Sequence, residues 1–464
     1  MLAHPSKVIF ALALFLSVFL FFMPAPAGVE PQVMKAGAVI VLAIGLWATA
    51  IVPSYFGSLI FLFMTVILSV APAKVVFSGF HAGATWLVFG GLVIGLGVKR
   101  SGLDVRLVRS LLTHFPKTYF AMIYGIFWIS TVLAFIVPSA SGRVALLVPI
   151  MLALADELGF EKDSKGRTGL VLAASMGTMI PAFNILPANV PNMALYGAAD
   201  SILGIQLTYA EYFILNFPIV GGAALLVYPA IIATLFKDTP RHPTHEQESA
   251  AWGGDEKRLL VIVLAALILW VTDSLHGISP AWISLGAAIL CLLPRTGMLP
   301  PSVLSGEINY SPLLFLVGVI GLGAVASHAD LGSLIAEKLM EVFEFKPGAD
   351  FQNFASISIS GMIVGLITTM PAQPSIMVPM AEALSQATGW SQLSVIMASM
   401  TAWGVMPFFY QAPPVVVAVA LGNLSITDVT KMLLTYMIFG VLIVLPLHFL
   451  WGQYIGMFTS LNGS

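Results

Sequence analysis

Two short polar segments interrupt an otherwise apolar chain, and the residues in each could bind an anion. The first directly follows a proline and consists of Ser139, Ala140, Ser141, Gly142 and Arg143. A helix that is broken at such a segment leaves backbone N–H groups without partners and carries partial positive charge at its N-terminus. Such helix ends bind anions. Because hydrocarbon penalises free N–H groups, the break must line a cavity inside the protein.

The second segment lies 230 residues later and has the same character. It precedes another apolar run and contains hydroxyl, amide and proline residues, namely Thr368, Thr369, Pro371, Gln373 and Ser375. Both segments are followed by a Val-Pro pair, and aligning these pairs places Ser139 opposite Thr369. We therefore expect the two segments to form matching halves of one substrate site.

A second pair of proline-rich breaks follows in the same order along the chain. Its members are Asn184, Pro187, Asn189, Pro191 and Asn192 in the first half, and Pro407, Tyr410, Gln411, Pro413 and Pro414 in the second. We take Asn189, Asn192, Gln411 and Pro413 as candidate substrate-binding residues. Glycine and proline are common in membrane helices, which accounts for single kinks but not for their pairing.

The composition indicates a polytopic, all-α membrane protein. The chain has 464 residues, of which 58% are hydrophobic and 9% charged, whereas soluble domains are about one quarter charged. The apolar run over 8–26 precedes an Ala-Pro-Ala sequence that resembles a signal-peptide cleavage site, but we expect an uncleaved first membrane helix. The single cysteine, Cys291, makes no internal disulfide. We expect a bacterial inner membrane protein with no nucleic-acid partner.

The two halves of the chain resemble each other. The pentapeptide VIGLG occurs at 93–97 and 319–323, and VPIMLALADELGF at 148–160 matches VPMAEALSQATGW at 378–390. A basic arm over 99–117 has five Lys/Arg, whereas the matching arm over 329–350 has two Lys and five acidic residues. Basic arms stay in the cytoplasm, so the charges favour two repeats of opposite topology. The sign contrast could also be incidental, because acidic residues carry little topological weight.

From these patterns we predict about 11 transmembrane segments, each of about 20 apolar residues. The predicted organisation consists of N-terminal scaffold and dimerisation helices, a first repeat, a polar cytoplasmic loop, linking helices and a second repeat: 1–75, 76–236, 237–258, 259–300 and 301–464. Interrupted helices in inverted repeats are typical of secondary transporters, whose substrates bind near the bilayer midplane.

With these features in place, the chain resembles the divalent-anion:sodium symporter family over roughly residues 35 to 452. The resemblance rests on the hairpin sequence ATWLVFGGLVIGLGVKRSGL at 84–103 and its echo SPLLFLVGVIGLGAVASHADL in the second half. It implies inverted-topology repeats with re-entrant hairpins and discontinuous helices, transport of di- and tricarboxylates or sulfate, and a homodimer. We therefore expect a secondary active transporter of small multivalent anions that works by cation-coupled symport or anion exchange.

The chain departs from the family pattern where each repeat should carry a Ser-Asn-Thr triplet. These triplets appear here as Ser139-Ala140-Ser141 and Thr369-Met370-Pro371, so both asparagines are missing. The resemblance implies sodium as the coupling ion, near Ser139, Ser141, Thr368 and Thr369, and no other cofactor. Because fewer side-chain oxygens are present, sodium coupling is not secured by the resemblance.

Arg143 has two interpretations. A buried arginine costs about 2.5–3.5 kcal/mol on insertion scales and should be paired or face water. Its planar guanidinium suits carboxylate or sulfate, so it could supply a fixed positive charge where relatives use a bound cation. Alternatively, it extends from a helix end toward the membrane surface.

Other classes of membrane protein fit the sequence less well. The chain has no phosphate-binding G-x-x-x-x-G-K-[ST] motif for an ATP-driven pump and no G-x-S-x-G motif for a hydrolase. A cation/proton antiporter of the same superfamily would call for carboxylates in the middle of the spans. It remains the nearer alternative, and an integral membrane enzyme the more distant one.

Overall fold

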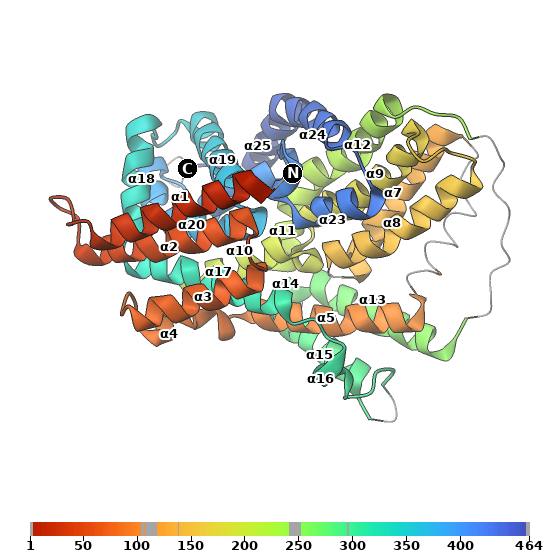
Figure 1. The fold of residues 1–464 in the computed structure, drawn as a ribbon, viewed down its shortest axis with the longest axis horizontal. Helices are drawn as coiled ribbons and strands as arrows, with labels where there is room; N and C mark the ends of the chain where they lie inside the picture. Colours follow the sequence, from red (N-terminus) through yellow and green to blue (C-terminus); the bar gives the residue numbers. More distant parts are fainter. Residues whose placement is uncertain are drawn as a thin grey trace.

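The computed structural model describes residues 3–103, 106, 118–137, 139–240, 252–294 and 297–460, and within these ranges the fold is entirely helical. Figure 1 shows α1 and α2 side by side, α5, α13 and α15 along one edge of the molecule, and α24 and α25 along the opposite edge. The fold is all-α, as expected.

The helices of the first half have these bounds: α1 (Ala3–Phe22), α2 (Pro31–Thr49), α3 (Ser54–Ile67), α4 (Ala73–Val76), α5 (Gly83–Ser101), α7 (Tyr119–Ile136), α8 (Ala140–Glu157), α9 (Lys165–Met179), α10 (Val190–Leu203), α11 (Tyr209–Asn216) and α12 (Gly222–Leu235). The helices of the second half are α13 (Gly254–Val271), α14 (Asp273–His276), α15 (Pro280–Leu292), α16 (Val303–Gly306), α17 (Ser311–His328), α18 (Leu331–Val342), α19 (Asp350–Ile367), α20 (Pro374–Met377), α21 (Ala381–Thr388), α22 (Gln392–Met400), α23 (Pro413–Gly422), α24 (Ile426–Phe439) and α25 (Leu445–Tyr454).

Six of the described helical stretches are long and apolar enough to cross a membrane: Pro31–Thr49, Tyr119–Ile136, Tyr209–Leu235, Ser311–His328, Asp350–Ile367 and Ile426–Tyr454. Shorter apolar helices accompany them, among them Ser54–Ile67 and Pro280–Leu292. Large apolar side chains on the outer helices are exposed, including Phe15 at 70% and Phe63 at 61%. Such surfaces suit lipid rather than water.

The same order of elements occurs in both halves. A long helix (α7 or α19) ends at a break, a helix that starts at the break follows, and a second break precedes a shorter helix (α10 or α23). Each half then has a long stretch interrupted by a π-helical turn, at Phe217–Gly221 in the first half and at Gly440–Val444 in the second. π turns are rare, so their matching places are an independent similarity between the halves.

Small residues allow the hairpin helices to pack closely. A Cβ atom on Gly90 of α5 would lie 2.3 Å from the Oγ of Ser284 in α15, and one on Gly318 of α17 would lie 2.3 Å from the Cβ of Ser58 in α3. Glycine is therefore required at both positions. Small residues at helix interfaces are the usual means of close packing in membranes, and here they explain the glycine-rich hairpin sequences.

The two halves interlock instead of forming separate bodies. The first-half helix α10 packs against α17 and α20, and the second-half helix α23 packs against α8 and α9. The predicted boundaries at 75, 236, 258 and 300 stay predictions. Most of the basic arm over 99–117 and positions 241–251 of the polar loop lie outside the described residues. The opposite orientation of the repeats, which rested on that arm, also stays a prediction.

Candidate substrate cavity

The first break positions the start of α8. The long helix α7 ends at Ile136, and the chain is extended at Ser139, with φ −151°, before α8 begins at Ala140. The Oγ of Ser139 accepts a hydrogen bond of 3.2 Å from the backbone N of Gly142. Serine is a favoured N-cap because its side chain replaces a missing backbone acceptor. The sequence thus starts a new helix here, and the backbone amides of its first turn have no acceptor within the helix.

The second break of the first half positions the start of α10. After α9 ends, two 3₁₀ turns (Pro181–Asn184 and Leu186–Ala188) lead to Asn189, the N-cap of α10. The Oδ1 of Asn189 accepts a hydrogen bond of 3.1 Å from the backbone N of Asn192. The side chain is 2% exposed, and its Nδ2 has no partner among the described residues. The Oδ1 of Asn189 therefore caps the helix, and its Nδ2 is left without an acceptor among the described residues.

In the second half the breaks follow the same plan with different residues. The 3₁₀ turn Met370–Ala372 begins after Thr369, whose side chain makes no capping hydrogen bond. Farther along, the chain between α22 and α23 passes through 3₁₀ turns at Thr401–Val405 and Phe409–Gln411. Prolines occupy the first two positions of α23, so this helix start lacks two N–H donors.

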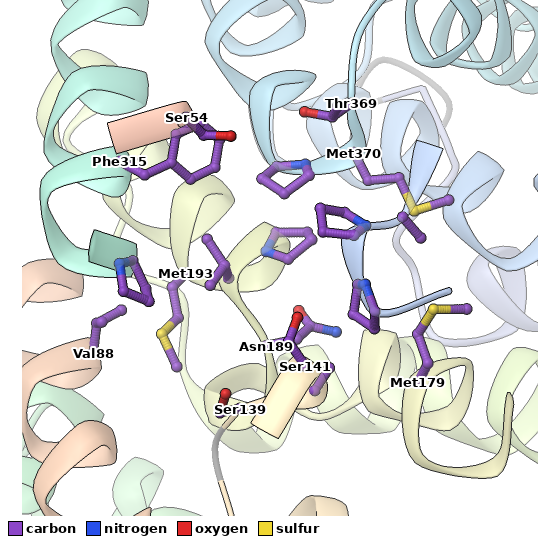
Figure 2. A pocket seen from close by; sticks show the side chains of 18 of the residues that line it. Ser54, Val88, Ser139, Ser141, Met179, Asn189, Met193, Phe315, Thr369 and Met370 are labelled. Carbon is purple, nitrogen blue, oxygen red and sulfur yellow. The ribbon is translucent and has the colours of Figure 1, made fainter. Parts of the chain in front are cut away.

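All four breaks border one cavity of about 310 Å³. Most of its lining residues lie at the starts of α3, α8, α10, α17, the 3₁₀ turn at Met370 and α23. The others come from α5, α9 and the 3₁₀ turn that follows α9. The lining residues are Ser54, Tyr55, Val88, Leu92, Ser139, Ala140, Ser141, Met179, Phe183, Asn189, Val190, Pro191, Met193, Ser311, Pro312, Phe315, Thr369, Met370, Pro371, Ala412, Pro413 and Pro414. Figure 2 shows side chains from both halves facing this space.

The cavity has several helix starts around it and no charged side chain in its lining. No Asp, Glu, Lys, Arg or His is among its lining residues. No hydrogen bond within the described part of the chain uses the backbone N–H of Ala140, Ser141, Val190 or Met370. These are first-turn amides, which have no acceptor inside their own helix. Helix starts that converge in this way place partial positive charge around the cavity, which suits an anion.

The cavity brings together about half of the predicted substrate-binding residues. Those that line it are Ser139, Ala140, Ser141, Asn189, Thr369, Pro371 and Pro413. Those outside the lining are Gly142, Arg143, Asn192, Gln373, Ser375 and Gln411. All six lie within a few positions of the lining residues. Gly142 has no side chain, and the other five have buried side chains that hydrogen-bond to backbone carbonyls.

Arg143 lies behind the cavity lining and away from the surface. Its side chain is 0% exposed and does not line the cavity, so it neither contacts that space nor extends to a surface. Its guanidinium donates to the Oγ1 and the carbonyl of Thr178, the latter at 2.7 Å, to the carbonyl of Val137 and to the carbonyl of Ala188 at 3.0 Å. The side chain was expected to need a partner or water, and its partners are three backbone carbonyls and the hydroxyl of Thr178.

The ion pairs found among the described residues do not include Arg143. Two of its acceptors, the carbonyls of Val137 and Ala188, lie just before Ser139 and Asn189, the N-caps of α8 and α10. The buried positive charge is therefore attached to the framework that carries both first-half helix starts.

Three buried side-chain amides that do not line the cavity hydrogen-bond to backbone carbonyls near the other breaks. Gln373 donates to the carbonyls of Gly361 at 3.0 Å and Ser399 at 3.1 Å, and accepts a 2.9 Å hydrogen bond from the indole N–H of Trp403. Gln411 donates to the carbonyl of Gly365 at 2.8 Å. Asn192 donates to the carbonyls of Ala182 and Ile185, at 2.9 and 2.7 Å. Gln373 and Gln411 thus hydrogen-bond to carbonyls of α19, and Asn192 to carbonyls of the segment between α9 and α10.

The cavity also includes residues that the sequence analysis did not select. Ser54 and Tyr55 lie at the start of α3, and Ser311 and Phe315 lie in the first turns of α17. Ser54 follows a proline and Ser311 precedes one. Serine beside proline is a signal for a helix start, and it could have added this wall to the predicted site.

The residues predicted to surround sodium have mixed positions. Ser139, Ser141 and Thr369 line the cavity, whereas Thr368 does not and donates its hydroxyl to the carbonyl of Val364 at 2.9 Å. The described residues contain no cluster of three or more His, Cys, Asp or Glu side chains that could hold a metal. Hydroxyl oxygens are therefore the side-chain ligands that this region offers a cation.

Comparison with known proteins identifies the family of the chain. The family model described as "Sodium:sulfate symporter transmembrane region" matches residues 5–458. "Inner membrane protein YbhI" of Escherichia coli K12 is 24% identical over 463 residues, which cover 94% of this chain and 95% of that protein. "Citrate/succinate antiporter" of the same strain is 30% identical over 213 residues, 42% of this chain and 43% of that protein. "L-tartrate/succinate antiporter" of E. coli UTI89 is 26% identical over 281 residues, 56% of this chain and 57% of that protein. The chain thus aligns with about half the length of each antiporter.

Proposed function

Because the chain belongs to the sodium:sulfate symporter family, and is therefore an integral membrane transporter and not an enzyme, we propose that it carries small di- or tricarboxylates through the cavity at the helix breaks. The observation that carries this proposal is the convergence of six helix or 3₁₀ starts on one space without a charged lining side chain. Relatives named for citrate, succinate and tartrate agree with an organic multivalent anion as the substrate. Sulfate, named in the family description, is the second candidate.

We infer alternating access between two inverted repeats. The repeated order of elements and the matching π turns support a repeat, and the difference in charge between the two arms supports its inversion. In such transporters, breaks from both repeats hold the substrate while one part of the protein moves relative to the other. The wall formed by α3 and α17 would then face the breaks from the stationary part, and the homodimer implied by the family resemblance would form through the N-terminal helices.

For coupling, we favour exchange of anions over symport with sodium. The side-chain oxygens near Ser139 and Thr369 belong to hydroxyls, and no carboxylate lines the cavity. Arg143 supplies a permanent positive charge behind the first-half helix starts. When the carrier returns without a bound anion, nothing neutralises this charge. A counter-anion neutralises that charge on the return step, and two of the relatives are named antiporters.

A cation/proton antiporter fits the cavity less well, because it needs an ionisable group that alternately binds the cation and the proton. No Asp or Glu lines the cavity. An integral membrane enzyme is excluded by membership of a transporter family.

The test is uptake of labelled succinate, citrate and sulfate into proteoliposomes that contain the purified chain. Each anion is offered with a sodium gradient, with a proton gradient, and with unlabelled succinate inside the vesicles. We expect succinate or citrate uptake that depends on internal succinate and does not respond to sodium. Uptake that requires sodium would overturn the proposed coupling, and absence of uptake for all three anions would overturn the substrate class.

A further inference from the structure

The two sides of the cavity have unlike chemistry. Ser139, Ser141 and Asn189, which we call the anion subsite, lie together on the first-half side in Figure 2. Asn189 has a buried amide donor without a partner among the described residues. The unused amides of the first turns of α8 and α10 lie at the same place. This side therefore offers several N–H and O–H donors to one carboxylate.

The second-half side offers far fewer donors. Met370, Pro371, Pro413 and Pro414, which we call the apolar wall, line it. Three of these four residues are prolines, which have no N–H. Next to this wall, Thr369 supplies a hydroxyl and Met370 one amide, and Ser311 at the start of α17 supplies a second hydroxyl. Figure 2 shows Met370 on the side of the cavity opposite the anion subsite.

A second space adjoins the apolar wall. Met370 also lines a neighbouring cavity of about 280 Å³, bounded mainly by apolar residues such as Met362, Met406 and Leu366. The side-chain amides of Gln373 and Gln411 in its lining already bind backbone carbonyls. The region around Met370 is therefore apolar on both of its faces and contributes a flexible side chain that adapts to different shapes.

We propose that the carrier selects dicarboxylates that bear apolar substituents over dicarboxylates that bear hydroxyl groups at the same carbons, and over sulfate. One carboxylate binds at the anion subsite, and the substituted carbon backbone packs against the apolar wall. The second carboxylate lies toward the hydroxyls of Thr369 and Ser311. This inference rests on the proposed transport of dicarboxylates and specifies which members of that class bind best.

The physical reason is the difference between a methyl and a hydroxyl group at an apolar surface. Each buried methyl group favours binding by about fourfold, from its transfer out of water. A hydroxyl group at the same place gains no such transfer and loses water without finding a partner. Two methyl groups should therefore favour binding by about tenfold or more. Sulfate fills only the anion subsite and gains nothing from the wall.

The test compares meso-2,3-dimethylsuccinate with meso-tartrate, which differ only in methyl and hydroxyl groups on the two central carbons. Each competes with the exchange of labelled succinate in proteoliposomes that contain the full chain. We expect the dimethyl compound to inhibit at a concentration at least about tenfold lower than tartrate. Equal inhibition, or stronger inhibition by tartrate or sulfate, would overturn the inference even when succinate exchange is normal. Absence of exchange of every labelled dicarboxylate would instead refute the proposed function.

Two variants at one position locate the effect. Met370→Asn introduces a polar amide into the apolar wall and should reduce the preference for the dimethyl compound to about twofold or less. Met370→Leu keeps the wall apolar at similar volume and should retain the preference. The ratio of the two inhibitor constants is independent of the amount of folded carrier, so a poorly expressed variant still gives an answer. An unchanged ratio in Met370→Asn would show that the apolar wall does not select the substrate.

Discussion

Arg143 and Gln373 occupy matching positions in the two interrupted segments. Comparing them distinguishes two roles, which are holding a helix break in place and placing positive charge beside it. Both side chains are buried, at 0% and 1% exposure. Each donates to backbone carbonyls of neighbouring segments, and neither lines the cavity. Each residue thus holds the chain in place at a helix break in its own half.

In the second half, a neutral amide is sufficient to hold the chain in place at the break. The charge on Arg143 therefore needs another reason, because a buried guanidinium without a carboxylate partner is costly. Its position behind the starts of α8 and α10, beside the proposed anion subsite, fits the proposed function, because a bound anion would neutralise the charge. The comparison teaches that the first half has a buried side chain that is both anchored and charged, whereas its counterpart in the second half is anchored and neutral.

The largest expected effect is that of Arg143→Ala. It removes the hydrogen bonds to the carbonyls of Val137, Thr178 and Ala188 and opens a cavity, at a cost of roughly 3–5 kcal/mol in the free energy of unfolding. Thermal unfolding in detergent should show a large decrease in melting temperature, with little transport. Arg143→Gln copies the residue of the second half, so it should regain part of the stability but not the affinity for succinate. Normal affinity in Arg143→Gln would remove the electrostatic role.

Gln373→Ala tests the second half of the comparison. Two carbonyls and the indole N–H of Trp403 lose their partner, which should lower the free energy of unfolding by about 2–3 kcal/mol. Because no charge is removed, the Michaelis constant for succinate in the folded fraction should change by less than about threefold. Gln373→Glu is the matched control: it keeps the acceptor for Trp403 but loses both donated hydrogen bonds. A tenfold change in affinity in Gln373→Ala would mean that both halves contribute equally to anion binding.

Asn189→Asp sharpens the comparison at the cavity itself. The carboxylate still accepts the hydrogen bond from the N of Asn192, so the cap of α10 is kept. The free amide donor is replaced by negative charge, and the Michaelis constant for succinate should rise about tenfold or more, which corresponds to 1.4 kcal/mol. Asn189→Ala should instead lose about 1 kcal/mol of stability through the missing cap. Unfolding and uptake measured on both variants distinguish the two roles, and unchanged uptake in Asn189→Asp would place the substrate elsewhere.

The smallest effect concerns an arginine that does have a carboxylate partner. Arg106 donates a 2.9 Å hydrogen bond to Glu256, which lowers the pKa of that carboxyl below its ordinary value of 4.5. A lowered pKa in the folded state means that the pair stabilises the fold above pH 4.5 and that this contribution is lost as the pH falls. Glu256→Gln should therefore lower the free energy of unfolding by at most about 1 kcal/mol at pH 7, and by less at pH 4.

The control for this pair is Asp255→Asn, which breaks an exposed ion pair with Arg258 of 3.6 Å in the same helical turn. It should change the melting temperature less than Glu256→Gln does at pH 7. A difference between Glu256→Gln and the unmodified chain that grows toward low pH would contradict the assigned pKa direction.

The membrane class, the positions of the helix breaks and the family could be predicted from the sequence because their causes are local. Proline removes an N–H group and serine or asparagine caps the next helix, so Ser139 and Asn189 mark helix starts wherever the helices pack. The scarcity of charge requires a lipid-facing surface. The glycine-rich hairpin sequences indicate close packing, although not which helix is the partner.

Only the tertiary structure decided which polar residues face the cavity. Ser139 and Arg143 are four residues apart on one helix start, yet one lines the cavity and the other binds carbonyls up to 45 residues away in sequence. Likewise, the wall at Ser54 and Ser311 joins the site only because α3 and α17 pack together. The sequence determined where the helices begin, since that depends on neighbouring residues. Packing between distant helices determined what those beginnings enclose, because a side chain's direction and partners depend on neighbours that the local sequence does not specify.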